Sequence, residues 1–299
     1  MKAMTAVRIR NMKMSQARIV MVTAYDYLFA GLADEAGVDM ILVGDSVGMV
    51  VQGRPTTLGV TLDEMIYHTR CVTARPRRCL IVGDLPFGSY QVSVEQAVES
   101  ACRLMAEGGA GAVKLEGGAE YADRIEAIAA AGIPVMGHVG LTPQSIHRFG
   151  GYKVQGRGDS RAKEIIDGAL ALEEAGAFSI VLEKVPEELA GEISEAVSVP
   201  TIGIGAGPKC DGQVLVLQDL LGLFEEFQPR FVRRYAELGQ ATREALSEYT
   251  REVREGAFPS AEHVYRRAPI RPAVSDVSDG SDGSESGGNG GEADGRGHA

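Results

Sequence analysis

The chain has 299 residues, of which 44% are hydrophobic, and a formal net charge of −11 at pH 7. The hydrophobic content is ample for a buried core, and the acidity argues against nucleic acid or an anionic membrane as the main partner. No apolar run approaches the ~20 residues that a membrane-spanning helix needs. The N-terminus also lacks the apolar segment of a secretory signal, so we expect a cytoplasmic protein.

The four cysteines give no sign of a disulfide framework or a zinc site. Cys71, Cys79, Cys102 and Cys210 are scattered, without a CxxC pair or zinc-like spacing. Isolated thiols of this kind fit a reducing compartment, and we expect each of them to serve in packing.

The predicted elements repeat one pattern along the chain, in which a helix ends in Ala-Gly or Gly-Ala and an apolar strand follows directly. At these junctions, the glycines expected to form left-handed helix caps are Gly37, Gly109, Gly132 and Gly176. The strands are short continuous apolar runs, which indicates a parallel sheet covered by helices on both faces. In chain order they are predicted at residues 19–23, 40–43, 80–83, 112–115, 134–137, 179–182 and 201–205, with a weaker eighth at 213–217.

Seven or eight such units over about 250 residues favour a (β/α)8 barrel (TIM barrel) of the α/β class. A doubly wound open sheet remains an alternative, because periodicity does not report whether a sheet closes. We expect one catalytic barrel domain over residues 1–271. From Pro272 onward the chain consists largely of Gly, Ser and acidic residues, so residues 272–299 are predicted to be a disordered acidic tail.

Acidic residues recur where the predicted strands end. The polar residues that follow the second to sixth strands are Asp45 with Ser46, Asp84, Glu116, His138 and Glu183. In a parallel βα barrel these ends meet at one mouth, which is the usual active-site face. Carboxylates gathered there repel each other unless a cation lies among them. Oxygen ligands without cysteine suit Mg²⁺ or Mn²⁺ better than zinc, so we predict a divalent metal site.

Within this group the residues divide into two sets. We expect Asp45 and Asp84 as direct metal ligands and Glu116 as a ligand acting through water, because Mg²⁺ usually retains several waters. Lys114 lies two residues before Glu116 and shares its face of the strand. Either Lys114 contacts a carboxylate or enolate oxygen of substrate, or it pairs with a neighbouring acid. Ser46 is placed to donate to the same anion.

Glu183 lies on a later strand, apart from the predicted metal cluster, which suits a general acid or base. His138 is the alternative for that role, although a lone histidine is more often structural. The stretch GIGAGP at 203–208 lacks a phosphate-binding spacing and is interpreted as a tight turn. The stretch GGYKVQGRG at 150–158 is either a mobile lid or a plain loop.

At these residues the sequence resembles the ketopantoate hydroxymethyltransferase family. The resemblance runs from about Arg18 to Pro259 and rests on nine stretches: MVTAYDY (21–27), DMILVGDSVGMVVQG (39–53), TLDEMIYHT (61–69), VGDLPFGSYQ (82–91), AVKLEGG (112–118), PVMGHVGLTPQS (134–145), GGYKVQGRG (150–158), AFSIVLE (177–183) and TIGIGAGPKCDGQVLV (201–216). It implies a (β/α)8 barrel that binds one Mg²⁺ per subunit, uses 5,10-methylene-tetrahydrofolate as co-substrate and forms homo-oligomers.

The implied reaction moves a hydroxymethyl group onto 3-methyl-2-oxobutanoate through a metal-stabilised enolate. It gives 2-dehydropantoate in pantothenate and coenzyme A biosynthesis. The implied metal ligands are Asp45, Asp84 and Glu116. The implied substrate contacts are Asp45, Ser46, Asp84 and Lys114, with Glu183 as proton acceptor. The chain departs from the family pattern at Val47 and at Lys184, and the latter is placed to alter the pKa of the adjacent Glu183.

Two other readings remain. A relative in the phosphoenolpyruvate mutase and isocitrate lyase group would also perform metal–enolate chemistry on a barrel. Those enzymes commonly carry a catalytic cysteine in a mobile loop, and GGYKVQGRG has none. A non-catalytic binding barrel is the second reading, and it leaves the acidic cluster unexplained.

Overall fold

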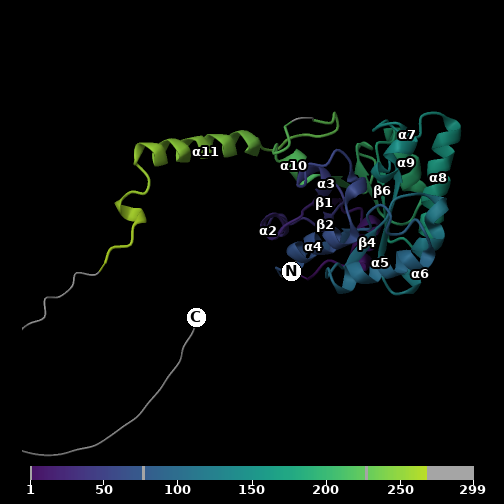
Figure 1. Cartoon of the computed structure of the whole chain (residues 1–299). Coiled ribbons are helices and arrows are strands. Elements are labelled where there is room, and N and C mark those ends of the chain that lie inside the picture. Colours follow the sequence, from purple (N-terminus) through teal and green to yellow (C-terminus); the bar gives the residue numbers. More distant parts are fainter. Residues whose placement is uncertain (1, 76–77, 226–227, 268–299) are drawn as a thin grey trace, which may run out of the picture. The chain divides into compact units, whose positions relative to one another are not determined.

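The computed structural model of the chain describes residues 2–75, 78–225 and 228–267 (Figure 1). The predicted disordered tail and the domain boundary before it, at residues 271 and 272, lie outside these residues. The chain divides into two units, one over Met1–Leu246 and one beginning at Ser247. Within the described residues, no helix combines the length and the apolar character needed to cross a membrane.

A closed barrel of eight parallel strands occupies the first unit, with each strand paired to the next in sequence order. The strands are β1 (Ile19–Thr23), β2 (Met40–Val43), β3 (Leu80–Asp84), β4 (Ala112–Lys114), β5 (Val135–Gly140), β6 (Ser179–Glu183), β7 (Thr201–Ile204) and β8 (Gly212–Leu215). The pairing of β1 with β8 brings Ile19 opposite Gly212 and closes the sheet. The predicted (β/α)8 barrel is therefore confirmed, and the open doubly wound sheet was wrong.

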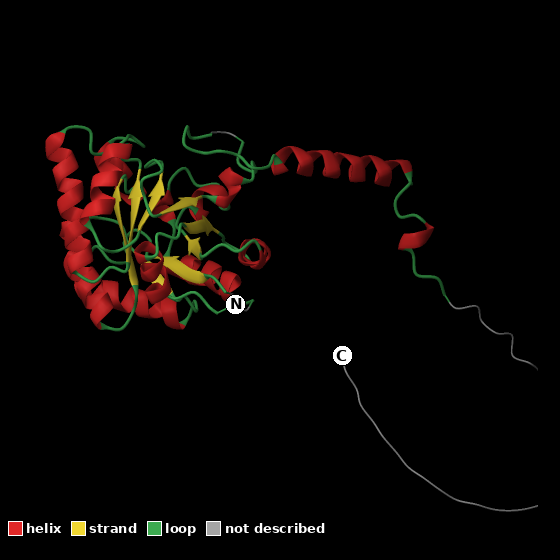
Figure 2. Ribbon diagram, turned by 180° about the vertical axis from the view of Figure 1, so that it is seen from behind, coloured by secondary structure: helices red, strands yellow, loops and turns green. Residues whose placement is uncertain are grey.

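Helices surround the strands (Figure 2). The α-helices are α1 (Ala6–Met14), α2 (Tyr27–Glu35), α3 (Val47–Val50), α4 (Leu62–Thr73), α5 (Val94–Ala106), α6 (Ala122–Ala130), α7 (Ile146–Phe149), α8 (Asp159–Glu174), α9 (Glu187–Ala196), α10 (Leu217–Leu220) and α11 (Leu238–Glu255). Short 3₁₀ turns are η1 (Thr57–Gly59), η2 (Ala119–Tyr121), η3 (Pro143–Ser145) and η4 (Ala261–His263).

Local chemistry fixes where the helices begin and end. The predicted cap glycines have left-handed backbone angles, with φ of 86° at Gly37, 76° at Gly109, 85° at Gly132 and 99° at Gly176. A capping box starts α4, in which the Thr61 side chain and the Glu64 backbone N–H form one hydrogen bond and the Glu64 carboxylate accepts the Thr61 N–H at 2.7 Å. These devices turn the chain back at the junctions where the next strand starts.

Apolar side chains on both faces of the strands are buried, which accounts for the continuous apolar runs in the sequence. One cluster fills the barrel interior and includes Met21, Met40, Leu42, Val82, Met136, Val181 and Ile202. The other lies between the sheet and the helices and includes Ile41, Val43, Ile81, Val113, Leu104 and Leu172.

Strand boundaries differ slightly from the sequence prediction, and the differences concern the site. β3 and β6 extend to include Asp84 and Glu183, and His138 lies inside β5 rather than after it. β4 ends at Lys114, so Glu116 lies two residues beyond its strand. Most of the candidate residues are therefore held by the hydrogen-bonded sheet rather than by loops, which favours fixed geometry.

The described part of the second unit contains the end of α11 and the turn η4. Its aromatic side chains contact one another, with ring centroids 5.5 Å apart for Tyr249 and Phe258 and 5.0 Å apart for Phe258 and His263. The site described below uses residues of the first unit.

A glycine on β5 gives a test of barrel packing. Gly140 has a φ of 95°, and a Cβ atom there would lie 2.4 Å from the Glu183 carbonyl oxygen. We expect Gly140→Ala to lower the free energy of unfolding by about 2–4 kcal/mol, because it combines an unfavourable backbone angle with a backbone clash. The matched control is Gly132→Ala, where φ is 85° and a Cβ meets nothing within 4 Å. Equal losses in urea unfolding of the two variants would contradict this account.

Candidate active site

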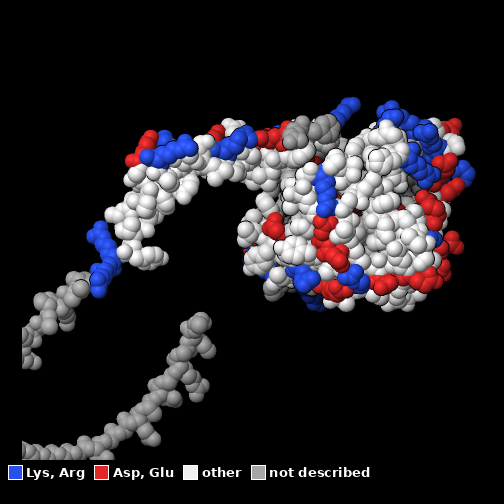
Figure 3. Space-filling view, viewed as in Figure 1, with Lys and Arg blue, Asp and Glu red and all other residues white. Residues whose placement is uncertain are grey.

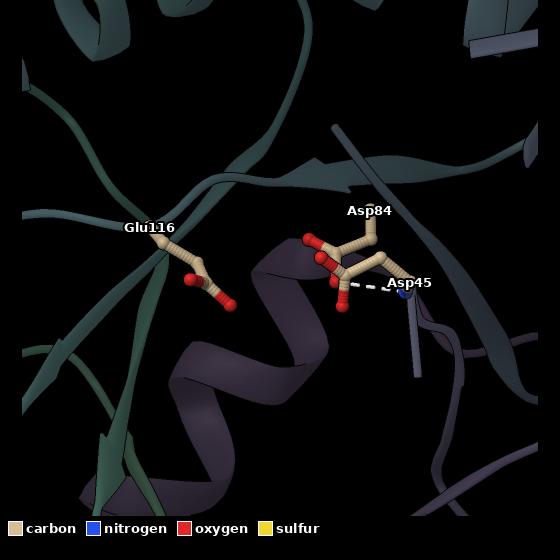
Figure 4. A group of neighbouring side chains, drawn as sticks. All are labelled: Asp45, Asp84 and Glu116. Carbon is tan, nitrogen blue, oxygen red and sulfur yellow. Dashed lines mark hydrogen bonds between the residues drawn. The ribbon is translucent and has the colours of Figure 1, made fainter. Parts of the chain in front are cut away.

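Three buried carboxylates lie together at the carboxyl ends of neighbouring strands (Figure 4). Asp45 follows β2, Asp84 ends β3 and Glu116 follows β4. One oxygen of each lies within 4.8 Å of the others, and the Asp45 backbone N–H donates to Asp84 Oδ2 at 3.3 Å. The structure thus brings together the three residues that the sequence selected as metal ligands.

Lys114 supplies a positive charge inside this cluster. Its Nζ lies 2.7 Å from Asp84 Oδ1 and 3.6 Å from Glu116 Oε1. Burial opposes the charged form of Lys114, but Asp84, Glu116 and Asp45 outweigh it and raise its pKa. The Lys114 side chain is therefore a buried cation. Of the two roles expected for it, contact with substrate or pairing with a neighbouring acid, the structure displays the pairing.

One lysine does not balance three carboxylates. Burial, Asp84 and Glu116 together raise the pKa of Asp45 well above its usual range. A divalent cation relieves such repulsion, and the donor set consists of hard carboxylate oxygens within reach of one ion. The residues present therefore fit a magnesium or manganese ion.

His138 lies between the acidic cluster and Glu183. Its Nδ1 is 3.4 Å from Glu116 Oε1, and its Nε2 is 3.5 Å from Glu183 Oε2. Burial raises the pKa of Glu183 to about 7, with Glu116 adding to the effect, while His138 and Lys184 oppose it. Glu183 is thus set apart from the three carboxylates, and its proton affinity suits a group that exchanges protons near neutral pH.

Gln144 and Tyr90 connect the carboxylates, and reading the strand ends did not select them. The Gln144 backbone N–H donates to Glu116 Oε2 at 3.0 Å, and its Nε2 donates to Asp45 Oδ2 at 2.9 Å. The Tyr90 hydroxyl lies 2.8 Å from Gln144 Oε1 and accepts the Glu116 N–H at 3.2 Å. Both residues fall within stretches that carry the family resemblance. That resemblance was the one feature of the sequence that pointed to them.

Ser46 is less buried than Asp45 and begins α3 at the same mouth. Its Oγ lies 2.8 Å from the Tyr25 hydroxyl, and either oxygen can donate. Burial raises the pKa of Tyr25, so this hydroxyl stays protonated and keeps a hydrogen for such a bond. Ser46 therefore has a fixed partner next to the three carboxylates.

Residues 150–158 are tied to the residue that follows Glu183. The Gln155 N–H donates to the Lys184 carbonyl oxygen at 2.8 Å, and Lys184 Nζ lies 5.3 Å from the centroid of the Tyr152 ring. Burial, Glu183 and Asp45 raise the pKa of Tyr152, which indicates that this ring lies within the field of the acids. The mobile lid and the plain loop both stay predictions for this stretch. In the other glycine-rich stretch, left-handed angles at Gly205 and Gly207 are consistent with the expected tight turn after β7.

The closed barrel and its mouth of buried ionisable groups define a (β/α)8-barrel enzyme. A protein-family model described as ketopantoate hydroxymethyltransferase matches residues 3–261. The chain is 56% identical to the 3-methyl-2-oxobutanoate hydroxymethyltransferase of Clostridium beijerinckii over 262 residues, which cover 88% of this chain and 95% of the relative. It is 53% identical to the enzyme of the same name from Geobacter sulfurreducens over 264 residues, covering 88% and 99%. The chain belongs to the ketopantoate hydroxymethyltransferase family.

Solved structures with the same fold are more distant in sequence. A phosphonopyruvate hydrolase in complex with oxalate and Mg²⁺ matches with a TM-score of 0.56 and 17% identity, over 87% of this chain and 93% of that one. A 2,3-dimethylmalate lyase of the phosphoenolpyruvate mutase and isocitrate lyase superfamily matches with the same TM-score and identity, covering 88% and 92%. At this identity the likeness shows the fold alone.

The crowding of carboxylates predicts a pH-dependent loss of stability. The pKa of Asp45 is raised in the folded protein, so its unfavourable contribution is absent below the pKa that the carboxyl has in the unfolded chain. The contribution grows as the pH rises above that value and is complete once the pH exceeds the folded-state pKa. In metal-free buffer we expect Asp45→Asn to raise the free energy of unfolding at pH 8 by about 1–3 kcal/mol, with a smaller gain at pH 5.

Urea unfolding at the two pH values measures this effect. The control is Asp123→Asn, whose side chain is 55% exposed, where we expect a change within about 0.5 kcal/mol. A variant at Asp45 that is less stable than the wild type at pH 8 would show that the carboxylates do not repel each other in the folded protein.

Proposed function

We propose that the protein transfers a hydroxymethyl group from 5,10-methylene-tetrahydrofolate to 3-methyl-2-oxobutanoate, giving 2-dehydropantoate. The observation that carries this proposal is the arrangement of three buried carboxylates around Lys114, with Glu183 held apart by His138. The names of the relatives support the choice of keto acid and of transferred group. The proposed setting is pantothenate and coenzyme A biosynthesis in the cytoplasm, in a homo-oligomer.

We assign Asp45 and Asp84 as direct ligands of one Mg²⁺ and Glu116 as a ligand acting through water. The ion when bound supplies Lewis acidity, which polarises the oxo group of the keto acid and acidifies its C3 proton. Gln144 orients the ligands, because it donates to both Asp45 and Glu116. Such outer hydrogen bonds fix the direction of carboxylate lone pairs.

Lys114 and Ser46 are the proposed partners of the keto acid, together with Asp45 and Asp84. Lys114 brings a buried positive charge to the strand end, where negative charge develops on the oxo oxygen when the C3 proton leaves. A preorganised cation at such a position stabilises the transition state more than the ground state. Ser46 donates a hydrogen bond to the same substrate, with Tyr25 fixing its hydroxyl.

Glu183 is the proposed base. In its ionised form it takes the proton from C3. Water adds to the methylene carbon of the donor and both bonds from that carbon to the folate nitrogens break, so tetrahydrofolate leaves and formaldehyde remains. The electron-rich C3 attacks the formaldehyde carbon, and the oxygen of the new hydroxymethyl group takes up the proton held by Glu183. His138 Nε2 lies 3.5 Å from Glu183 Oε2 and is placed to stabilise the ionised Glu183 carboxylate before it takes the C3 proton. Once Glu183 is protonated, this contact is no longer needed.

Labelled keto acid tests this function directly. With Mg²⁺ alone, we expect the protein to exchange the C3 deuterium of 3-methyl-2-oxobutanoate with water, and with methylene-tetrahydrofolate to form 2-dehydropantoate, both followed by NMR. A protein that exchanges no deuterium under any condition would be a binding barrel. Exchange without product in the presence of folate would indicate another second substrate, such as one used by the mutase and lyase group.

Glu183→Gln is the matched variant for this assay. We expect it to lower exchange and turnover by roughly 10²–10⁴-fold, since a positioned base contributes about that much, while keto acid and metal still bind. In the wild type kcat/KM should rise as the pH increases through about 7, because the base works in its ionised form. The control Glu187→Gln alters a half-exposed carboxylate of α9 and should keep both the rate and this pH dependence. Near-normal turnover in Glu183→Gln would assign the base to another group, with His138 next.

Metal binding gives an independent prediction from thermal unfolding. Mg²⁺ that binds only the folded protein should raise the Tm, by an amount set by its concentration relative to its Kd. We expect the shift to disappear in Asp84→Asn and to persist in Glu183→Gln. A shift of equal size in Asp84→Asn and the wild type would place the ion elsewhere.

A further inference from the structure

A cavity lies beside the barrel mouth, and none of Asp45, Asp84 and Glu116 lines it. Its volume is about 900 Å³, within the size range of small-molecule sites. It is bounded by the chain after β4, the end of β5, η3, α7, residues 153–157 and the first half of α8. Gly117, which directly follows Glu116, and Gly140, the last residue of β5, line it. The cavity therefore shares two strand ends with the proposed active site.

Four cationic side chains line this cavity: Arg148, Lys153, Arg157 and Arg161. Among residues 2–75, 78–225 and 228–267, none of the four has a carboxylate within ion-pair distance. Figure 3 shows Lys and Arg gathered where α7 and the start of α8 lie. All four are exposed, and in a chain with a net charge of −11 such a group of cations without carboxylate partners attracts anions.

The N-terminus of α8 adds positive electrostatic potential next to these four cations. α8 has 16 residues, its N-cap is Gly158, and no side chain among the described residues caps it by a hydrogen bond. Unpaired N–H groups at the start of a helix attract anions, and the helix dipole has the same sign there. Arg157 and Arg161 flank this N-terminus, and Asp159 lies between them in the first turn, so the side chains here carry two positive charges against one negative charge.

Three acidic residues also line the cavity, Glu120, Glu164 and Asp167, and Glu164 lies three residues after Arg161 on α8. Glu164 and Asp167 lie about one and two turns further along α8, and Asp167 is paired with Lys163 at 2.8 Å. The Glu120 carboxylate accepts the Gly118 N–H at 3.2 Å, next to the strand end. Apolar walls are provided by Val139, Phe149 and Ile165. The lining thus combines four cationic side chains with three acidic ones and with apolar walls.

We propose that this cavity binds the γ-glutamate tail of the folate co-substrate, with the tail carboxylates at Arg148, Lys153, Arg157 and Arg161. This inference rests on the proposed function, because it requires a folate as donor. The keto acid and the metal ligands occupy the barrel mouth, where the one-carbon unit must also arrive. The tail is the part of a folate that carries carboxylates, and it lies at the opposite end of the molecule from the pterin. A cationic cavity next to the mouth is complementary to that distribution of charge.

The test compares methylene-tetrahydrofolate carrying one glutamate with the same compound carrying three. In the wild type we expect a KM roughly three- to tenfold lower for the triglutamate, the scale of one or two exposed charge pairs. The double variant Arg157→Gln/Arg161→Gln should bring the ratio of the two KM values close to one. Added salt should reduce the wild-type ratio in the same direction, because exposed charges are screened.

Lys163→Gln is the control, since it removes a positive charge from the same helix on a side chain that is 74% exposed and paired with Asp167. It should keep the wild-type ratio, and thermal unfolding should show that all variants are folded. A double variant with an unchanged ratio, or a control that loses the ratio, would overturn the proposal.

Three further outcomes separate the possible sources of the anion and distinguish failure of this proposal from failure of the proposed function. Inorganic phosphate that changes kcat with the monoglutamate, in a way lost in the double variant, would identify a regulatory anion site and overturn the assignment to the folate tail. Absence of turnover with either folate, in a wild type that exchanges the C3 deuterium, would refute the proposed donor. Turnover with the monoglutamate but no preference for the triglutamate would refute the cavity assignment alone.

Discussion

The site depends on the ion pair between Lys114 and Asp84. The pairing of β3 with β4 sets these two residues side by side in the sheet, so the contact follows from the fold itself. It lets carboxylates from three strand ends share a buried mouth, which would otherwise be strongly unfavourable. The compensation is partial, because Asp45 still has a raised pKa. The barrel mouth therefore holds more buried carboxylates than its one buried lysine balances, at a cost in stability.

The sequence predicts most of this architecture because burial on both faces of a parallel sheet leaves continuous apolar runs. The signal was weakest for β8, and the structure shows why: Gln213 on that strand is exposed, so the run is broken. The strand ends were predictable for a related reason. In a closed parallel barrel every carboxyl end faces one mouth, so Asp84, Glu116 and Glu183 could be placed near each other without knowing any distance.

The hydrogen bonds that organise those acids could not be predicted in this way. Gln144 reaches Asp45 from 99 positions away in the chain, and it does so from a short 3₁₀ turn whose direction no periodicity reports. Tyr90 likewise acts from a connection between β3 and α5. For His138 the sequence left a structural role and a catalytic one open, and only the coordinates place its two nitrogens between Glu116 and Glu183.

Closure of the sheet has a consequence for how the protein acquires its site during synthesis. The acidic residues come from β2, β3, β4 and β6, yet the curvature that converges them depends on β1 pairing with β8. A growing chain that has emerged only as far as Glu183 carries every one of these side chains and still has open sheet edges. Such edges are templates for association with other chains. Because closure requires the strand contact most distant along the chain, we expect the barrel to form slowly relative to its local helices and the unfinished chain to be exposed to misassembly.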